Sequence, residues 1–133
     1  MASVRKEIAI AAPAATVWAA LADFHAVHKR LAPGFVTDSK PDGEAARIVT
    51  FANGTSAREI LVDSNATLMR LVYAIARSER LKHHNASAQV VALSPKTCCF
   101  IWVTDFLPDE IGPYIDAQMS QGAEVMKRTL EGT

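Results

Sequence analysis

The sequence predicts an α+β domain in which one antiparallel sheet carries helices on one face, and three observations support this. The chain has 133 residues, the length of a single domain. Apolar and polar residues alternate along 3–10 and along most of 35–106, whereas 13–33 and 109–132 show helical spacing. Short turn signals separate consecutive strands, which requires antiparallel pairing, and strands segregated from helices are typical of α+β folds.

The N-terminal part predicts a strand followed by helical structure. Residues 3–10 alternate between two faces, as in a strand. Residues 13–33 place apolar side chains at steps of three or four, at Val17, Leu21, Phe24, Val27 and Leu31. Asp23 fits the cap of a second helix, so we expect two short helices that end at Pro33-Gly34.

The middle of the chain predicts strands joined by short turns. Asn53-Gly54 is the strongest hairpin signal, because both residues tolerate positive φ. Pro41-Asp42-Gly43 and Ser94-Pro95-Lys96 are further turn signals. Together with 3–10, the strands complete a seven-stranded sheet, and we expect them at 35–40, 46–52, 55–63, 67–77, 86–93 and 97–106.

The last segment, 109–132, predicts one long helix. Its first turn holds Gly112-Pro113, and Gly132 fits its C-terminal end. Gly122 and Ala123 are small residues in its middle, so we expect a space between helix and sheet that side chains do not fill. One stripe faces the sheet: Ile111, Ile115, Met119, Gly122, Met126 and Leu130.

Charge and composition exclude several classes of partner. Lys and Arg total 14 and Asp and Glu total 14, whereas nucleic acid and anionic membranes attract clustered cations. The apolar runs are shorter than the ~20 residues of a membrane span. Glu7 and Pro13 argue against a signal peptide, and the two adjacent cysteines build no disulfide framework. We expect a cytoplasmic protein with no nucleic-acid partner.

The cysteines and histidines predict neither a nucleophile nor a metal site. Strand alternation sends Cys98 and Cys99 to opposite faces, with no His or Asp placed to activate either. His83-His84 is split in the same way, and only one of the two can face a cavity. His25 and His28 could share a helix face, but no second ligand pair accompanies them. We expect no metal and no cofactor.

Five stretches occur in an order typical of one superfamily: "IAAPAATVWAALADF", "PDGEAARIVTFANG", "REILVDSN", "LVYAIARS" and "TCCFIWVTDFLP". This ordered set resembles the START-like helix-grip superfamily (SRPBCC), and within it the polyketide cyclase/dehydrase-like group. The resemblance covers essentially all of 1–133 as one domain. It implies a curved seven-stranded antiparallel sheet that encloses a cavity with two short N-terminal helices and a long C-terminal helix.

Two stretches depart from the pattern of these relatives. "HKRLAPG" carries Leu31 where relatives often have an aromatic residue. "LKHHNAS" replaces a Pro-Val and a Tyr that often enter the sixth strand. Both departures alter the expected mouth of the cavity, so the ligand of a relative does not carry over.

Strand alternation predicts which side chains line that cavity. We expect Arg70 to point to water, and the aromatic face of 97–106 to lie under the long helix because it has the most surface to bury. Such aromatics can equally be plain core residues. The expected ligand-binding set is Met69, Leu71, Tyr73, Ile75, His84, Phe100, Trp102, Thr104, Phe106, Met119 and Gly122.

The catalytic candidates are Glu59, Tyr73 and Arg47. Alternation allows either Glu59 or Arg58 to point inward, and the resemblance favours Glu59 inward beside Arg47. Glu59 could then be a buried acid with a raised pKa, suited to proton transfer next to a carbonyl. It could equally be a surface residue paired with Arg58 or Arg47.

The opposite face of 97–106 is also apolar. Cys99, Ile101 and Val103 lie on it, and Val72 and Ala74 of what we take as the neighbouring strand add to it. An exposed apolar sheet face indicates a partner, so we expect a possible homodimer through this outer face.

Three functions remain open at this point. The first is a protein that holds an apolar or amphipathic ligand (a lipid, an isoprenoid or an aromatic, polyketide-like compound) between sheet and helix. The second is a cofactor-independent cyclase/dehydrase- or isomerase-type enzyme with Glu59 as acid/base. The third is a non-catalytic interaction protein with a mostly filled cavity. No catalytic dyad stands out in the sequence, which favours binding.

Overall fold

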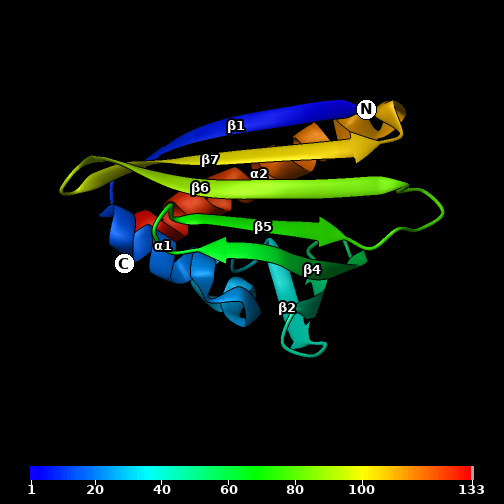
Figure 1. Cartoon of the computed structure of the whole chain (residues 1–133), viewed down its shortest axis with the longest axis horizontal. Helices are drawn as coiled ribbons and strands as arrows, with labels where there is room; N and C mark the ends of the chain where they lie inside the picture. Colours follow the sequence, from blue (N-terminus) through cyan, green and yellow to red (C-terminus); the bar gives the residue numbers. More distant parts are fainter. Residues whose placement is uncertain (133) are drawn as a thin grey trace.

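The computed structural model describes residues 1–132, and its elements follow the predicted order (Figure 1). The helical elements are α1 (Ala14–Ala22), η1 (Phe24–Ala26), η2 (Val27–Leu31), η3 (Asp109–Ile111) and α2 (Gly112–Glu131). The strands are β1 (Ala2–Ile10), β2 (Val36–Pro41), β3 (Ala46–Phe51), β4 (Ser56–Asn65), β5 (Arg70–Ile75), β6 (His83–Ser94) and β7 (Thr97–Leu107).

The seven strands form one antiparallel sheet in the order β1-β7-β6-β5-β4-β3-β2. Figure 1 shows α1 and α2 on the same face of this sheet. This arrangement is the α+β helix-grip fold that the sequence predicts. β1 pairs with β7, so the first and last strands of the sequence are neighbours at one edge of the open sheet.

Two strands, β5 and β6, start three residues away from their predicted positions. β5 begins at Arg70 instead of residue 67, because Asn65 accepts the Leu68 backbone N–H in a turn and Met69 has a φ of 51°. β6 begins at His83, three residues before the predicted 86, because its pairing with β7 continues to Leu107. The extension of β6 is what brings His84 into the sheet.

The second short N-terminal helix that the sequence predicts consists of two helical turns of different kinds. Behind α1 the chain makes a 3₁₀ turn, η1, and a single π-helical turn, η2. Asp23 caps neither of them, and its carboxylate instead accepts a hydrogen bond from Arg30 Nη1 at 2.9 Å. Val27 and Leu31 of η2 are nevertheless buried, and both line the cavity described below.

The long helix α2 packs across the concave face of the sheet with the predicted stripe inward. Met119, Gly122, Met126 and Leu130 are buried. Polar contacts fix its other side to β1 and the residue after it: Lys6 pairs with Asp116, Lys127 Nζ donates to the Ala9 carbonyl, and the Ala11 N–H donates to Glu131.

The outer sheet face is less apolar than the sequence indicates. β6 lies between β5 and β7, so Val72 and Ala74 are not neighbours of Ile101 and Val103. The outward residues of β6 that separate them are Asn85, Ser87 and Gln89. Polar groups therefore interrupt the apolar surface on which the homodimer prediction depends, and the dimer stays a prediction.

No helix within residues 1–132 is long and apolar enough to span a lipid bilayer. The cytoplasmic location stays a prediction of the sequence.

Candidate ligand-binding cavity

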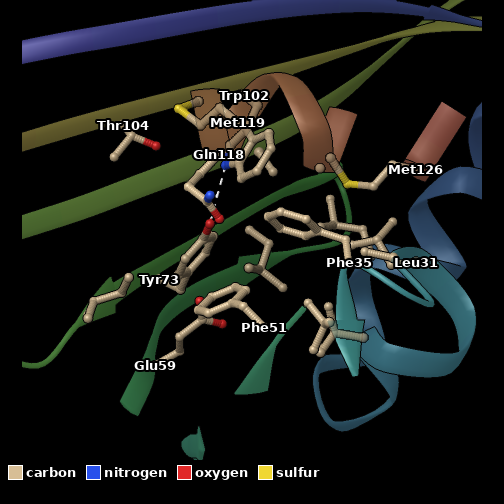
Figure 2. A pocket seen from close by; sticks show the side chains of 18 of the residues that line it. Leu31, Phe35, Phe51, Glu59, Tyr73, Trp102, Thr104, Gln118, Met119 and Met126 are labelled. Atoms are coloured by element: carbon tan, nitrogen blue, oxygen red, sulfur yellow. Dashed lines mark hydrogen bonds between the residues drawn. The ribbon is translucent and has the colours of Figure 1, made fainter. Parts of the chain in front are cut away.

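A cavity of about 150 Å³ lies between the sheet and α2 and is partly open to the surface. Figure 2 shows Leu31, Phe35 and Met126 gathered at one end, with Tyr73, Glu59 and Thr104 toward the other. Most of the lining is apolar. The apolar side chains of the wall include Leu21, Val27, Ala32, Val36, Ile75, Ala88, Phe100, Ile115 and Met119.

Most of the predicted ligand-binding residues do line this cavity. Leu71, Tyr73, Ile75 and His84 contribute from β5 and β6, as predicted. The others that line it are Phe100, Trp102, Thr104, Met119 and Gly122, together with the catalytic candidates Arg47 and Glu59.

Two predicted residues do not reach the cavity. Met69 lies in the turn before β5, where its positive φ takes the side chain out of strand alternation and packs it against the edge of the core. Phe106 is buried on the predicted face, but its ring lies under Gly112 at the start of α2, beyond the cavity. Alternation thus assigns the face of Phe106 correctly but not the point at which the cavity ends, and it does not apply to Met69, which lies outside β5.

The mouth of the cavity consists of residues that the sequence did not single out. Phe35, Phe51 and Gln118 are half-buried lining residues, and Tyr114 is exposed. The rings of Phe35 and Phe51 lie 5.6 Å apart between centroids. Tyr114 Oη accepts a hydrogen bond from Asn53 Nδ2 at 3.2 Å, which connects α2 to the β3–β4 turn. An available signal was Phe35 directly after Pro33-Gly34, an aromatic residue where the chain turns into the sheet.

Gly122 has a different role from the one predicted. A Cβ atom at this position would lie 3.1 Å from the Phe35 ring and 3.3 Å from the Trp102 ring. The small residue therefore does not leave an unfilled space over itself. It lets two aromatic rings pack directly against the backbone of α2, and those rings form part of the cavity wall.

The ion pair of Arg47 and Glu59 forms the charged part of the wall. The two residues face each other on β3 and β4, and both are buried. Arg47 Nε and Nη2 donate to the same carboxylate oxygen, Glu59 Oε1, at 2.8 and 2.6 Å. Arg47 Nη1 donates to the Phe24 carbonyl, and the guanidinium stacks 3.9 Å from the centroid of the Phe24 ring. Glu59 is thus inward beside Arg47, as the resemblance implies.

Tyr73 is held as a protonated phenol. Trp102 Nε1 donates to Tyr73 Oη at 3.2 Å, drawn as the dashed line in Figure 2. Burial raises the pKa of Tyr73 well above its ordinary value, and the charge of Glu59 adds to this. The Trp102 hydrogen bond and the charge of Arg47 oppose the rise without cancelling it. Because Trp102 uses a lone pair of Oη, the Tyr73 hydroxyl hydrogen stays available for donation.

His84 is a buried, neutral imidazole. Burial lowers its pKa to about 4, an interaction of the ring with the backbone of His84 itself opposes this, and the nearby charge of His83 adds to the lowering. Its Nδ1 atom has no hydrogen-bond partner within residues 1–132. The centroids of the His84 and Tyr73 rings lie 5.8 Å apart. We call Arg47, Glu59, Tyr73 and His84 the polar cluster.

The remaining reactive groups do not form a second site. Cys98 is buried and Cys99 half-buried on opposite faces of β7, as predicted, and burial raises the pKa of the Cys98 thiol. Over the described residues, no three His, Cys, Asp or Glu side chains lie close enough to bind a metal ion. His25 instead contacts the Glu44 carbonyl through Nε2.

The cavity is therefore suited to a neutral, largely apolar guest. Arg47 is the only Lys or Arg among the described residues of the wall, and its guanidinium is already paired. A ligand carboxylate or phosphate would lack a free cation and would face the Glu59 carboxylate. The Tyr73 hydroxyl, the Glu59 carboxylate and His84 are the polar groups of the cluster that a neutral ligand could meet.

Comparison with solved structures reveals the same fold at low sequence identity. An uncharacterized protein from Bacillus thuringiensis superposes with a TM-score of 0.86 at 18% identity, covering 97% of this chain and 98% of that chain. A START superfamily protein from Mycobacterium smegmatis gives 0.72 at 14% identity, covering 98% and 94%. Zhui aromatase/cyclase from Streptomyces sp. R1128 gives 0.75 at 16% identity, covering 98% and 92%.

Sequence comparison identifies the family. No curated protein matches the sequence. The family model described as polyketide cyclase/dehydrase and lipid transport matches residues 1–132, which is nearly the whole chain. This match agrees with the helix-grip fold and with the START-like neighbours. The chain belongs to the polyketide cyclase/dehydrase and lipid transport family.

Proposed function

We propose that this protein binds one small, neutral, apolar molecule about the size of a single aromatic ring. The carrying observation is the cavity of about 150 Å³ with its mostly apolar wall. An apolar cavity of about 150 Å³ is large enough for benzene. Aromatic lining from Phe35, Phe51, Phe100 and Trp102 offers stacking and edge contacts to a ring.

The size of the cavity favours this ligand over the other predicted classes. A fatty acyl chain or a multi-ring polyketide needs a pocket of several hundred Å³, the usual range for ligands of that size. The third alternative, an interaction protein, requires a mostly filled interior, and the cavity of about 150 Å³ argues against it. With about eight non-hydrogen atoms, the ligand should bind with a Kd between about 1 mM and about 10 µM.

The experiment is a thermal unfolding series with p-xylene and, separately, palmitate. At tenfold excess over its Kd, p-xylene should raise Tm by about 4 °C, whereas palmitate should have a smaller effect. Ile115→Trp, which fills the cavity at the mouth, should abolish the p-xylene effect. Ile111→Trp is the matched control, because Ile111 is half-buried on the same helical stripe but does not line the cavity.

Absence of a p-xylene effect in the wild-type protein, together with no change in the NMR signals of the cavity residues, would refute the proposal. A larger effect of palmitate than of p-xylene would instead support lipid carriage. Native mass spectrometry of the purified protein adds two readouts, a co-purified ligand and the homodimer predicted for the outer sheet face.

An enzymatic role is the second candidate, and one observation favours it. Both Arg47 contacts to Glu59 end on Oε1, so Oε2 is the carboxylate oxygen that Arg47 does not occupy. Glu59 Oε2 could remove a proton from the carbon next to a ligand carbonyl. The electron pair of the broken C–H bond would move to the carbonyl oxygen, and the Tyr73 hydroxyl could donate to that oxygen. Zhui, a structural neighbour, is an aromatase/cyclase.

Exchange of the methyl hydrogens of acetophenone in D₂O tests this candidate by NMR. The wild-type protein should accelerate the exchange, and Glu59→Gln should remove the acceleration while leaving p-xylene binding intact. Equal exchange rates with the two proteins would exclude Glu59 as a base.

A further inference from the structure

The polar cluster contains one atom that the fold leaves without a partner. His84 is 7% exposed, and its Nδ1 has no hydrogen bond within residues 1–132. A buried polar atom without a partner destabilises the folded state, and such atoms are uncommon in folded proteins. His84 lines the cavity and its Nδ1 is fully buried, so a ligand group can pair with this atom once the imidazole turns toward the cavity.

Tyr73 offers a complementary group next to His84. Its hydroxyl oxygen accepts from Trp102, and its hydrogen is free to donate. The raised pKa keeps this phenol protonated across the physiological range, so Tyr73 acts as a donor and not as an anion. With ring centroids 5.8 Å apart, Tyr73 and His84 are close enough for one small ligand group to contact both.

The charges of Arg47 and Glu59 determine which kind of ligand group fits beside Tyr73 and His84. Arg47 directs its guanidinium at Glu59 and the Phe24 carbonyl, so no cation is free to neutralise an anionic ligand. Glu59 adds negative charge and an acceptor oxygen. A neutral hydroxyl suits this environment, because it accepts a hydrogen bond from Tyr73 and donates one to a nitrogen or carboxylate acceptor.

We propose that Tyr73 and His84 form a subsite that recognises a single hydroxyl group on the aromatic ligand, which makes phenols the preferred ligand class. This inference rests on the proposed binding function and names the substrate class of the same cavity. The ring of the phenol lies among the apolar side chains, and its oxygen lies between Tyr73 Oη and His84 Nδ1.

The test compares p-cresol, p-xylene and benzaldehyde, which have the same number of non-hydrogen atoms. Isothermal titration of the wild-type protein should give a Kd for p-cresol about tenfold below the Kd for p-xylene, the effect of one to two net hydrogen bonds. His84→Phe should reduce this preference to less than twofold. Tyr73→Phe, which keeps the ring, should also reduce it and tests the subsite independently of how His84→Phe folds.

His83→Phe is the matched control. His83 is the adjacent residue on the opposite side of β6 and does not line the cavity, so its replacement should leave the tenfold preference unchanged. A ¹⁵N-labelled sample adds a direct readout, because p-cresol, but not p-xylene, should shift the His84 Nδ1 resonance.

The outcomes separate this inference from the proposed function. If neither p-cresol nor p-xylene binds, the binding function itself is wrong. If both bind with equal Kd, or if His84→Phe and Tyr73→Phe keep the preference, the cavity binds ligands but the hydroxyl subsite is wrong. If benzaldehyde binds as tightly as p-cresol, the subsite recognises a carbonyl, and the assignment to phenols is overturned.

Discussion

Arg47 on β3 and Glu59 on β4 form a buried ion pair in which two guanidinium nitrogens share one carboxylate oxygen, at 2.8 and 2.6 Å. The pair joins two neighbouring strands and is also part of the cavity wall. Its charges cancel inside the protein, so the polar cluster adds hydrogen-bonding groups to the cavity with little net charge.

Removing one partner of this pair should be strongly destabilising. Arg47→Met leaves the Glu59 carboxylate buried without a cation, and we expect a loss of about 3–5 kcal/mol in the free energy of unfolding, measured by urea denaturation. Arg58 lies next to Glu59 on β4 and forms an exposed ion pair with Asp42. Arg58→Met, which breaks that pair, should lower the free energy of unfolding by less than about 1 kcal/mol. The double variant Arg47→Met/Glu59→Leu should recover much of the loss, and a loss equal to that of Arg47→Met alone would contradict the interpretation.

The unfolding free energy should depend on pH through His84. The pKa of His84 is lowered from 6.5 to about 4 in the folded protein, so between these values the unfolded chain binds a proton that the folded protein does not. Stability therefore falls as the pH decreases from 6.5 toward 4, and the His84 contribution between pH 7 and pH 5 is about 2 kcal/mol. His84→Phe should show a correspondingly weaker dependence over this range.

His83→Phe serves as the control for the pH series, since His83 is half-buried and has no resolved role in the cavity. Its pH dependence should stay much closer to that of the wild-type protein than that of His84→Phe does, because burial and not the charge of His83 is the main cause of the lowered pKa of His84. If His84→Phe and the wild type lose the same stability between pH 7 and pH 5, His84 is not a buried neutral imidazole.

Gly122→Ala should narrow the cavity without unfolding the protein. The new methyl group would approach the rings of Phe35 and Trp102 and shift them by a few tenths of an ångström. Alanine improves helix propensity by about 1 kcal/mol, which offsets part of this strain. We expect the unfolding free energy to change by less than about 1 kcal/mol and the Kd for p-xylene to rise about fivefold. Ser120→Ala, exposed on the same helix, should leave the Kd unchanged.

The two tryptophans should report differently on ligand binding. Trp102 lines the cavity, whereas Trp18 packs against the core from α1 and does not line it. In a Trp18→Phe variant, p-cresol should change the fluorescence of the remaining Trp102. In a Trp102→Phe variant, the emission of Trp18 should stay constant. Likewise, Trp102→Ala should weaken ligand binding more than Trp18→Ala, and equal losses in two folded variants would argue against this cavity.

Much of the fold follows from local periodicity, because a period of two fixes which side chains share a face of a strand. Phe100, Trp102 and Thr104 line the cavity as alternation predicts. Periodicity gives no strand order, however. Alternation is compatible with a β5 strand that lies beside β7. In the structure β6 lies between these two strands, and its outer face is polar.

The limits of the cavity were less predictable because they depend on where α2 crosses the sheet. Phe106 shares a face with Trp102, yet it lies beneath the first turn of α2 instead of the cavity. The positive φ of Met69 is uncommon for a residue with a long side chain, so nothing in the sequence marks it. The prediction that Glu59 points inward beside Arg47 depended on the family resemblance, because alternation alone allows either face of β4 to point inward.

The attachment of α2 is asymmetric, and this determines how the cavity can change size. Along the β1 side, Asp116, Lys127 and Glu131 tie both ends of the helix to the first strand and the residue after it. On the opposite side, the hydrogen bond from Asn53 to Tyr114 joins α2 to the β3–β4 turn. The helix is thus held along β1 by three polar contacts and on the side of the cavity by the hydrogen bond from Asn53 to Tyr114. Loss of the Asn53–Tyr114 hydrogen bond would therefore loosen α2 beside the cavity and leave its attachment to β1 intact.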